Sequence, residues 1–330
     1  MNILFSFSAV LILVIVAIVG AGTIKLDFLF GIILPYAAFV TFIVGIVGQV
    51  IKWAKSPVPF HIPTVAGQQK SLPWIKSSKL ESPSSTLGVI GRMLLEILFF
   101  RSLFRNTKTE LRQGPKLSYG SNKYLWLGAL VFHWSFLIIV LRHFRFFMEP
   151  IPSFVIALQN LDGFFQIGLP VLFVTDILIV SAVLFLFFRR IVDSKIRLIS
   201  LASDYFPLLL IFSIAVTGIL MRYFDKVDII KIKEFAIGLF SFHPAVPEGI
   251  GVMFFIHLFL VCALIIYFPF SKLLHAPGIF LSPTRNLANN SRMKRHVNPW
   301  DHPVKVHTYE EYEDEFREKM IGAELPVDKE

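Results

Sequence analysis

Long apolar stretches alternate with short polar segments along most of this sequence. A helix needs roughly 20 apolar residues to cross the hydrocarbon core of a bilayer, and six stretches approach that length. They comprise residues 3–21, 28–51, 125–141, 169–188, 205–221 and 249–270. The pattern predicts an all-α integral membrane protein with six transmembrane helices in one bundle and with both chain termini on the same side.

A polar region interrupts this pattern between residues 52 and 123. It is basic and rich in Pro, Ser and Gln, and it contains one amphipathic run, 87–104, shortly after Ser85. Arg92 and Glu96 occur in that run at helical spacing, which favours an interfacial or partner-docking helix over a seventh span.

A second polar region, residues 282–330, ends the chain. It is first basic and rich in Asn and then acidic, as expected of an ordered docking arm or a solvated tail. We therefore divide the chain into two N-terminal helices (1–51), a polar segment (52–123), a four-helix domain (124–281) and a tail (282–330).

Composition places the chain in lipid. The 330 residues are 55% hydrophobic, include 35 Phe and have a mean hydropathy of +0.67, values too high for a soluble domain to bury in one core. Gly20 and Ala21 resemble a signal-peptide cleavage site, but the basic start typical of such a peptide is missing. We expect the first stretch to be retained as a membrane helix.

Lys and Arg are concentrated in alternate loops. Between Lys52 and Lys123 there are twelve basic and three acidic residues, and the loop after the fourth stretch begins with Arg189 and Arg190. Cytoplasmic loops carry such an excess, so we expect these segments and both termini in the cytoplasm, with the chain in the cytoplasmic (inner) membrane. The formal net charge of +9 then reflects orientation and requires no nucleic acid as a partner.

Nine histidines and one cysteine supply the candidate chemistry. Cys262 alone cannot form an intramolecular disulfide, ligate an iron-sulfur cluster or attach haem covalently through a CxxCH motif. Four histidines lie within or at the ends of apolar stretches: His133, His143, His257 and His275. The remaining histidines lie in loops or the tail, where a solvated role is expected: His61, His243, His296, His302 and His307.

Facing helices commonly hold haem iron between two imidazoles. The third and sixth stretches run antiparallel, so His133 should meet His275 near the cytoplasm. By the same reasoning His143 should meet His257 nearer the outside. Ten residues separate the two histidines of the third stretch, about 15 Å along a helix, and eighteen separate the two of the sixth, about 27 Å. Distortion at Pro269 would absorb part of this mismatch. The pattern predicts two haem b groups stacked across the membrane.

The two helices also differ in how they present their imidazoles. Eighteen residues are five helical turns, which keeps His257 and His275 on one face. Ten residues leave His133 and His143 about 80° apart around their helix. Spacing alone therefore does not explain how the two pairs align.

Charged residues at the outer end of the third stretch are further candidates. Arg142 and Arg145 flank His143, and Arg222 ends the fifth stretch on the same side. They are either interfacial anchors that reach lipid phosphates or partners of haem propionates and a quinone headgroup. Asp176 lies at membrane depth, where an acid is costly, and it either relays a proton or bonds a neighbouring hydroxyl.

The histidine spacings of ten and eighteen resemble those of the respiratory nitrate reductase gamma subunit, a family of dihaem b membrane proteins. Residues 59–63, 67–76, 87–92 and 100–107 are in addition similar to the DsrM family, the membrane cytochromes b of the dissimilatory sulfite reduction (DsrMKJOP) complexes. These resemblances imply haem ligands at the four histidines named above and menaquinone as the lipid electron carrier. They provide no motif for the quinone site.

The DsrM resemblance also implies partners. They are a cytoplasmic iron-sulfur subunit related to heterodisulfide reductase (DsrK-like), a periplasmic multihaem cytochrome c, a periplasmic iron-sulfur subunit and a second membrane subunit. A small sulfur-carrying protein would be the eventual cytoplasmic substrate, while this chain conducts electrons. Two alternatives stay open: a quinol-linked cytochrome b of another reductase, and a haem-free ion or proton transporter.

Overall fold

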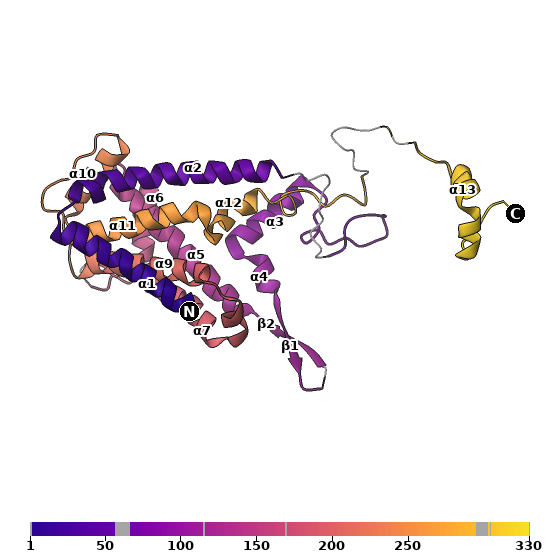
Figure 1. Ribbon diagram of the computed structural model, residues 1–330, viewed down its shortest axis with the longest axis horizontal. Helices are drawn as coiled ribbons and strands as arrows, with labels where there is room; N and C mark the ends of the chain where they lie inside the picture. Colours follow the sequence, from indigo (N-terminus) through magenta and orange to yellow (C-terminus); the bar gives the residue numbers. More distant parts are fainter. Residues whose placement is uncertain are drawn as a thin grey trace.

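The computed structural model describes residues 2–56, 67–114, 116–168, 170–294, 303 and 305–329 (Figure 1). The long helices are α1 (Asn2–Ala17), α2 (Leu34–Ala54), α5 (Lys123–His143), α7 (Val174–Val192), α9 (Ala202–Tyr223) and α11 (Val252–Tyr267). The shorter helices are α3 (Thr86–Phe99), α4 (Arg101–Arg105), α6 (Ser153–Asp162), α8 (Ser194–Ile199), α10 (Ile229–Phe240), α12 (His275–Phe280) and α13 (Tyr309–Gly322). Two strands, β1 (Thr107–Arg112) and β2 (Lys116–Ser121), form a hairpin.

The predicted all-α membrane class is confirmed. By length and composition, five helices in the described part of the chain can cross a membrane: Asn2–Thr23, Leu29–Ala54, Lys123–Phe146, Ala202–Tyr223 and Val252–Phe270. The predicted span 169–188 corresponds to α7, which begins later, at Val174, and contains Asp176, Arg189 and Arg190. Because of these charges α7 is not among the five helices that are apolar enough to cross a membrane, although it packs between α5 and α9. The sixth span therefore stays a prediction. Leu169 lies outside the described residues.

The long helices form one bundle with two distinct ends (Figure 1). We call the end at which α2 finishes and α5 begins the proximal end, and the end that carries α6 and α10 the distal end. Within the bundle α5 packs on α7, α7 on α9, and α9 on both α1 and α11, while α2 packs on α11. The proximal end is the one expected in the cytoplasm.

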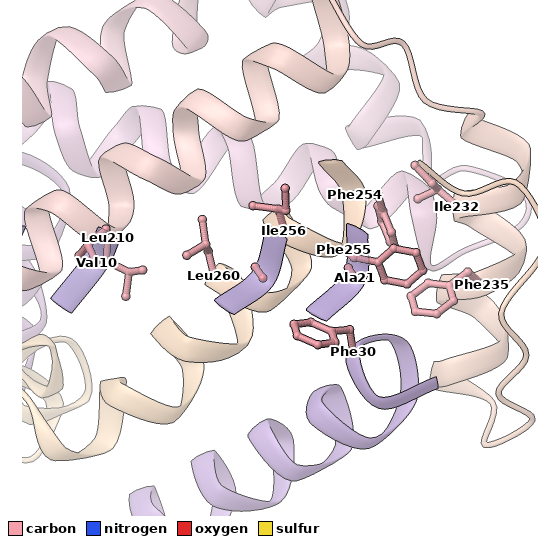
Figure 2. Close-up of a cluster of buried hydrophobic side chains, with 11 residues drawn as sticks. Val10, Ala21, Phe30, Leu210, Ile232, Phe235, Phe254, Phe255, Ile256 and Leu260 are labelled. Carbon is pink, nitrogen blue, oxygen red and sulfur yellow. The ribbon is translucent and has the colours of Figure 1, made fainter. Parts of the chain in front are cut away.

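The bundle core lies where α1, α2, α9, α10 and α11 meet (Figure 2). Leu210 and Leu260 are completely buried there, and the rings of Phe235 and Phe254 meet edge to face with centroids 5.4 Å apart. Lipid tails are as apolar as these side chains, so helix association depends on close packing and on hydrogen bonds between helices. One such bond is donated by Ser6 Oγ of α1 to the carbonyl of Ala202, over 2.9 Å.

The proximal polar segment contains the predicted amphipathic helix, but in two pieces. Ser85 caps α3 by accepting a hydrogen bond from the Gly88 amide, and the helix ends at Phe100, which has left-handed backbone angles (φ 49°). Two indoles of α5 satisfy the free carbonyls at that end: Trp126 Nε1 donates to Phe99 O over 2.7 Å and Trp134 Nε1 to Leu98 O over 3.0 Å. The hairpin that follows α4 was not predicted.

The start of the tail packs on the polar segment. The Asn289 amide donates to Pro83 O over 2.7 Å, and the Asn289 side chain donates to Ser82 Oγ over 3.2 Å. Arg285 forms an ion pair of 3.0 Å with Glu96 of α3. Regions predicted as separate therefore share one folded unit at the proximal end. Residues 59–63, which contributed to the DsrM resemblance, lie outside the described residues.

Small residues permit the close approach of α2 and α11. A Cβ added at Gly45 would lie 2.6 Å from Pro269 Cβ and 3.2 Å from the Phe270 ring. Three residues further along α2, a Cβ added at Gly48 would meet no atom within 4 Å. Gly45 is therefore the point at which α2 contacts the end of the α11 segment.

We predict that Gly45→Ala destabilises the protein by about 1–3 kcal/mol, because the new methyl group must displace the Pro269 ring in a packed interface. Gly48→Ala is the matched control and should be neutral or stabilising by up to about 1 kcal/mol, since alanine is the better helix former. Thermal or denaturant unfolding of both variants in the same detergent checks this. Equal stability of the two variants would show that α2 and α11 are not tightly packed at Gly45.

Candidate functional site

The two histidine-bearing helices, α5 and α11, are not packed directly on each other. Helix α5 packs on α7 and α11 packs on α9, and in the described part of the chain α5 and α11 share at most slight close backbone contact. Helices α7 and α9 therefore separate the two helices that carry His133, His143 and His257.

The proximal pair is His133 and His275, whose ring centroids are 6.0 Å apart at an interplanar angle of 86°. His133 lies in the middle of α5, and its ring also meets the Phe100 ring at 4.9 Å. The prediction that these two histidines lie next to each other is confirmed.

The predicted placement of His275 on the same helix as His257 is wrong. Helix α11 ends at Tyr267, short 3-10 turns follow (Phe268–Phe270 and Lys272–Leu274), and His275 opens the separate helix α12. Pro269 lacks the amide hydrogen that would continue the helix, and Ser271 is extended (φ −125°, ψ 175°). The mismatch between 15 and 27 Å therefore does not arise, because the second distance does not follow one helix axis.

The distal pair is His143, the last residue of α5, and His257 in α11. Both residues lie toward the distal end of the bundle, His143 where α5 ends and His257 in the second turn of α11. On the α9 side, His257 lies against Gly218, where an added Cβ would stand 3.3 Å from the ring. The antiparallel helices thus bring His133 and His275 together near the proximal end and place His143 and His257 both near the distal end.

All four imidazoles use the same nitrogen for a protein contact. The Nδ1–H groups of His133 and His143 donate to the carbonyls of Ala129 and Ile139, both over 2.7 Å. His275 Nδ1–H donates to Lys272 O over 2.8 Å. Because a carbonyl oxygen only accepts, these bonds fix the proton on Nδ1 and leave the Nε2 lone pair free.

His257 also has its proton on Nδ1, but its hydrogen-bond acceptor is a hydroxyl group and not a backbone carbonyl. Thr217 Oγ1 donates to backbone carbonyls one turn earlier in α9 (Ser213 O at 2.9 Å, Ile214 O at 3.0 Å). Its lone pair can then accept from His257 Nδ1–H, which lies 2.9 Å away. Protein-bound metal ions are typically held by imidazoles whose other nitrogen is hydrogen-bonded in this way.

The arrangement fits a metal held from two sides. Two imidazoles that bind one metal through nitrogens about 2 Å from it have ring centroids about 6 Å apart. The proximal centroid distance of 6.0 Å agrees with this requirement. Moreover, none of the four rings is fully covered by protein: His143 and His275 are exposed, and His133 and His257 are half-buried.

A buried charge network lies beside the distal pair. Arg142 Nε is 3.2 Å from Asp162 Oδ2, and Arg142 Nη2 donates to Asp176 Oδ1 over 3.2 Å. Asp176 Oδ2 accepts from the Tyr223 hydroxyl over 2.8 Å. Asp162, from α6, also accepts from the Thr175 amide over 2.8 Å, so a carboxylate sits at the N-terminus of α7. The network joins α5, α6, α7 and α9.

The arginines near His143 differ in how fully they are engaged. Arg142 and Arg222 both lie 3.8 Å from the centroid of the Phe173 ring, which is consequently held between two guanidinium groups. Arg145 has a neutral partner, Gln159 Oε1, at 3.2 Å. Of the three, Arg142 is the one that forms ion pairs with carboxylates in the described part of the chain.

Sequence reasoning identified Asp176 but missed Asp162, Phe173, Thr217 and Tyr223. Asp162 lies outside the long apolar stretches, so nothing in its local pattern marks it as buried. The loop histidines behave as expected where they are described: His243 is exposed, and His307 lies 3.7 Å from Glu315 in the tail. His61, His296 and His302 lie outside the described residues.

A helical membrane bundle with two facing imidazole pairs is the arrangement of the membrane cytochromes b. Comparison with known families agrees with that class, because residues 94–296 match the nitrate reductase gamma subunit family. The chain belongs to this family.

Two similar proteins come from archaea. The chain is 43% identical over 280 residues to an Hdr-like menaquinol oxidoreductase cytochrome b-like subunit of Archaeoglobus fulgidus, covering 83% of both chains. It is 42% identical over 275 residues to the protein of the same description from Archaeoglobus profundus, covering 81% of both chains. The similarity therefore extends well beyond the histidine-bearing helices.

We predict that Asp162→Asn destabilises the protein by about 3–5 kcal/mol, because it removes one of the two carboxylates that compensate the buried Arg142 guanidinium. Asp225→Asn, at an exposed carboxylate just after α9, is the control and should change stability by less than about 0.5 kcal/mol. Unfolding of both variants in detergent measures the difference. Similar stability of the two would mean that the distal network contributes little to the fold.

Proposed function

We propose that this chain is a menaquinol- or menaquinone-linked dihaem cytochrome b that carries electrons across the membrane. One haem b is held by His133 and His275, and the other by His143 and His257. The observation that carries the proposal is the shared hydrogen bonding of the four imidazoles, each with Nδ1–H engaged and Nε2 available. The family and the menaquinol oxidoreductase relatives support it.

The protein's part in this function is positional. Haem iron, when bound, supplies one-electron chemistry by alternating between two oxidation states. The chain fixes four imidazole tautomers, holds α5 apart from α11, and places one pair toward each end of the bundle. Electrons can then pass between the two ends without movement of the helices.

We place the quinone headgroup at the distal end, beside His143, with Arg142 or Arg145 contributing. A quinone tail needs lipid while its oxygens need hydrogen-bond donors, and both conditions meet at this end of α5. Arg142 is already shared between Asp162 and Asp176, whereas Arg145 has one neutral partner. Arg145 is therefore the arginine better able to donate to a quinone oxygen.

The proximal end is proposed to face the cytoplasm and to dock a heterodisulfide reductase-like iron-sulfur subunit. The two archaeal relatives are Hdr-like menaquinol oxidoreductase subunits, which supports a partner of this type. The remaining partners implied by the DsrM resemblance, the sulfite or sulfur chemistry of a DsrMKJOP complex and the inner-membrane orientation belong to the same proposal. Copurification distinguishes this complex from another quinol-linked reductase.

We predict that single alanine variants remove the haems in complementary pairs. His143→Ala and His257→Ala should each halve the haem content by removing the same haem, and His133→Ala and His275→Ala should each remove the other, because each iron loses one of its two ligands. Haem quantified as the pyridine haemochrome, together with reduced-minus-oxidised spectra, measures this. His243→Ala is the control and should retain both haems.

A protein that binds no haem would contradict the proposal and favour the transporter alternative. Loss of the same haem in His133→Ala and His257→Ala would contradict the pairing. A finer test uses Thr217: Thr217→Val should weaken retention of the distal haem by about 10–100-fold, and Thr217→Ser, which keeps the hydroxyl, should not.

We further predict that Arg145→Ala slows menaquinol-driven haem reduction by about 10–100-fold while the haem spectrum is unchanged, because a charged donor to the quinone oxygen is lost. Stopped-flow reduction by a menaquinol analogue measures this, with proximal Arg197→Ala as the control. Normal kinetics in Arg145→Ala and in the Arg142→Ala/Arg145→Ala double variant would move the quinone site toward Asp176 or the proximal pair.

A further inference from the structure

The β1–β2 hairpin has two chemically different faces. Its antiparallel register pairs Thr109 with Tyr119 and Leu111 with Leu117, so these side chains share one face. The alternate pairs, Lys108 with Gly120 and Glu110 with Ser118, share the other. The ribbon therefore has an apolar face, which consists of Thr109, Leu111, Leu117 and Tyr119, and a polar face.

Nothing in the described chain covers the apolar face. Leu111 is 75% exposed, Leu117 55% and Tyr119 68%. An isolated two-stranded hairpin is marginally stable at best in water, and exposing three large apolar side chains makes it less favourable. A surface outside this chain is needed to cover them.

The hairpin lies where a membrane surface is expected. Its second strand ends at Ser121, and the membrane-spanning helix α5 begins at Lys123. Figure 1 shows the hairpin leaving the proximal end of the bundle, beside the start of α5. The ribbon therefore lies next to the position at which the chain is expected to enter the membrane.

The residues around the ribbon suit the headgroup region of a bilayer. Tyr119 and Tyr124 are 68% and 82% exposed, and tyrosine is enriched at membrane interfaces. Lys108, Lys116 and Lys123 are exposed, and lysines beside an apolar surface attract anionic lipids.

The base of the hairpin is fixed to the bundle. Both Arg101 and Arg105 of α4 form ion pairs with Glu81. The Phe104 ring meets the Trp126 ring of α5 with centroids 4.9 Å apart, and Lys123 Nζ lies 5.3 Å from the Phe104 ring. The ribbon is therefore held at a defined height relative to the start of α5, which a freely moving loop would not be.

We propose that this hairpin is a membrane-surface foot: its apolar face enters the headgroup region of the bilayer beside the bundle, and its lysines contact anionic phospholipid. The lipid is the occupant favoured by the position of the ribbon at the start of a spanning helix, by its exposed tyrosines and by its exposed lysines. The foot extends the contact of the protein with the membrane beyond its spanning helices.

The test places nitroxide labels on single cysteines in the full-length protein, in a Cys262→Ala background. Leu111→Cys, Leu117→Cys and Tyr119→Cys report on the apolar face, and Lys108→Cys and Ser118→Cys report on the other. The protein is reconstituted into vesicles of phosphatidylcholine with phosphatidylglycerol. Power saturation then compares the access of oxygen, which concentrates in lipid, with that of a water-soluble nickel chelate.

We expect oxygen access to dominate at residues 111, 117 and 119 and nickel access at 108 and 118, a reversal that follows the two-residue period of a strand. In phosphatidylcholine alone the contrast should shrink, because the lysines lose their anionic partners. Equal nickel access at all five positions would overturn the proposal. Protection of the apolar face from both reagents, seen only in the copurified complex, would also overturn it by placing a partner protein there.

Discussion

The end of α11 before His275 is the constraint on which the histidine arrangement depends. Pro269 cannot continue the helical hydrogen bonding, and Ser271 turns the chain into an extended conformation. His275 therefore approaches His133 from a separate helix, free of the spacing that a continuous α11 would impose. The same segment rests on α2 at Gly45. Gly45 on the neighbouring helix and Pro269 in the chain therefore together determine where His275 meets His133.

The distal end is held by charge instead of by a helix break. Arg142 precedes His143 directly, and two carboxylates from different helices fix its guanidinium. A buried ion pair gains little net stability over apolar packing, but losing one partner is expensive, so the geometry around His143 is narrowly defined. The two ends of the bundle thus orient equivalent imidazoles by different physical means, one by backbone geometry and the other by a network that can exchange hydrogen bonds with a polar ligand.

Much of this arrangement could be predicted from the sequence. Long apolar runs located the spanning helices, and antiparallel direction alone paired His133 with His275 and His143 with His257. The local sequence pattern did not predict the features that depend on tertiary contacts. Nothing near Asp162 shows that it will cap α7, and Thr217 resembles any other threonine in a helix. The hairpin was missed because its two strands are only six residues long and lie in a polar, basic segment. The break after Tyr267 was underestimated because one proline commonly kinks a helix without ending it.

Phe100 connects the polar segment to the proximal pair. It joins α3 to α4 in a backbone conformation that bulky residues rarely adopt, and its ring meets His133 at 4.9 Å. The carbonyls of the two residues before it are held by Trp126 and Trp134, and Trp134 is the immediate neighbour of His133. The turn at Phe100 and the His133 imidazole are therefore connected by direct contacts. A displacement of α3 would therefore reach His133 through the direct contacts of Phe100 and Trp134.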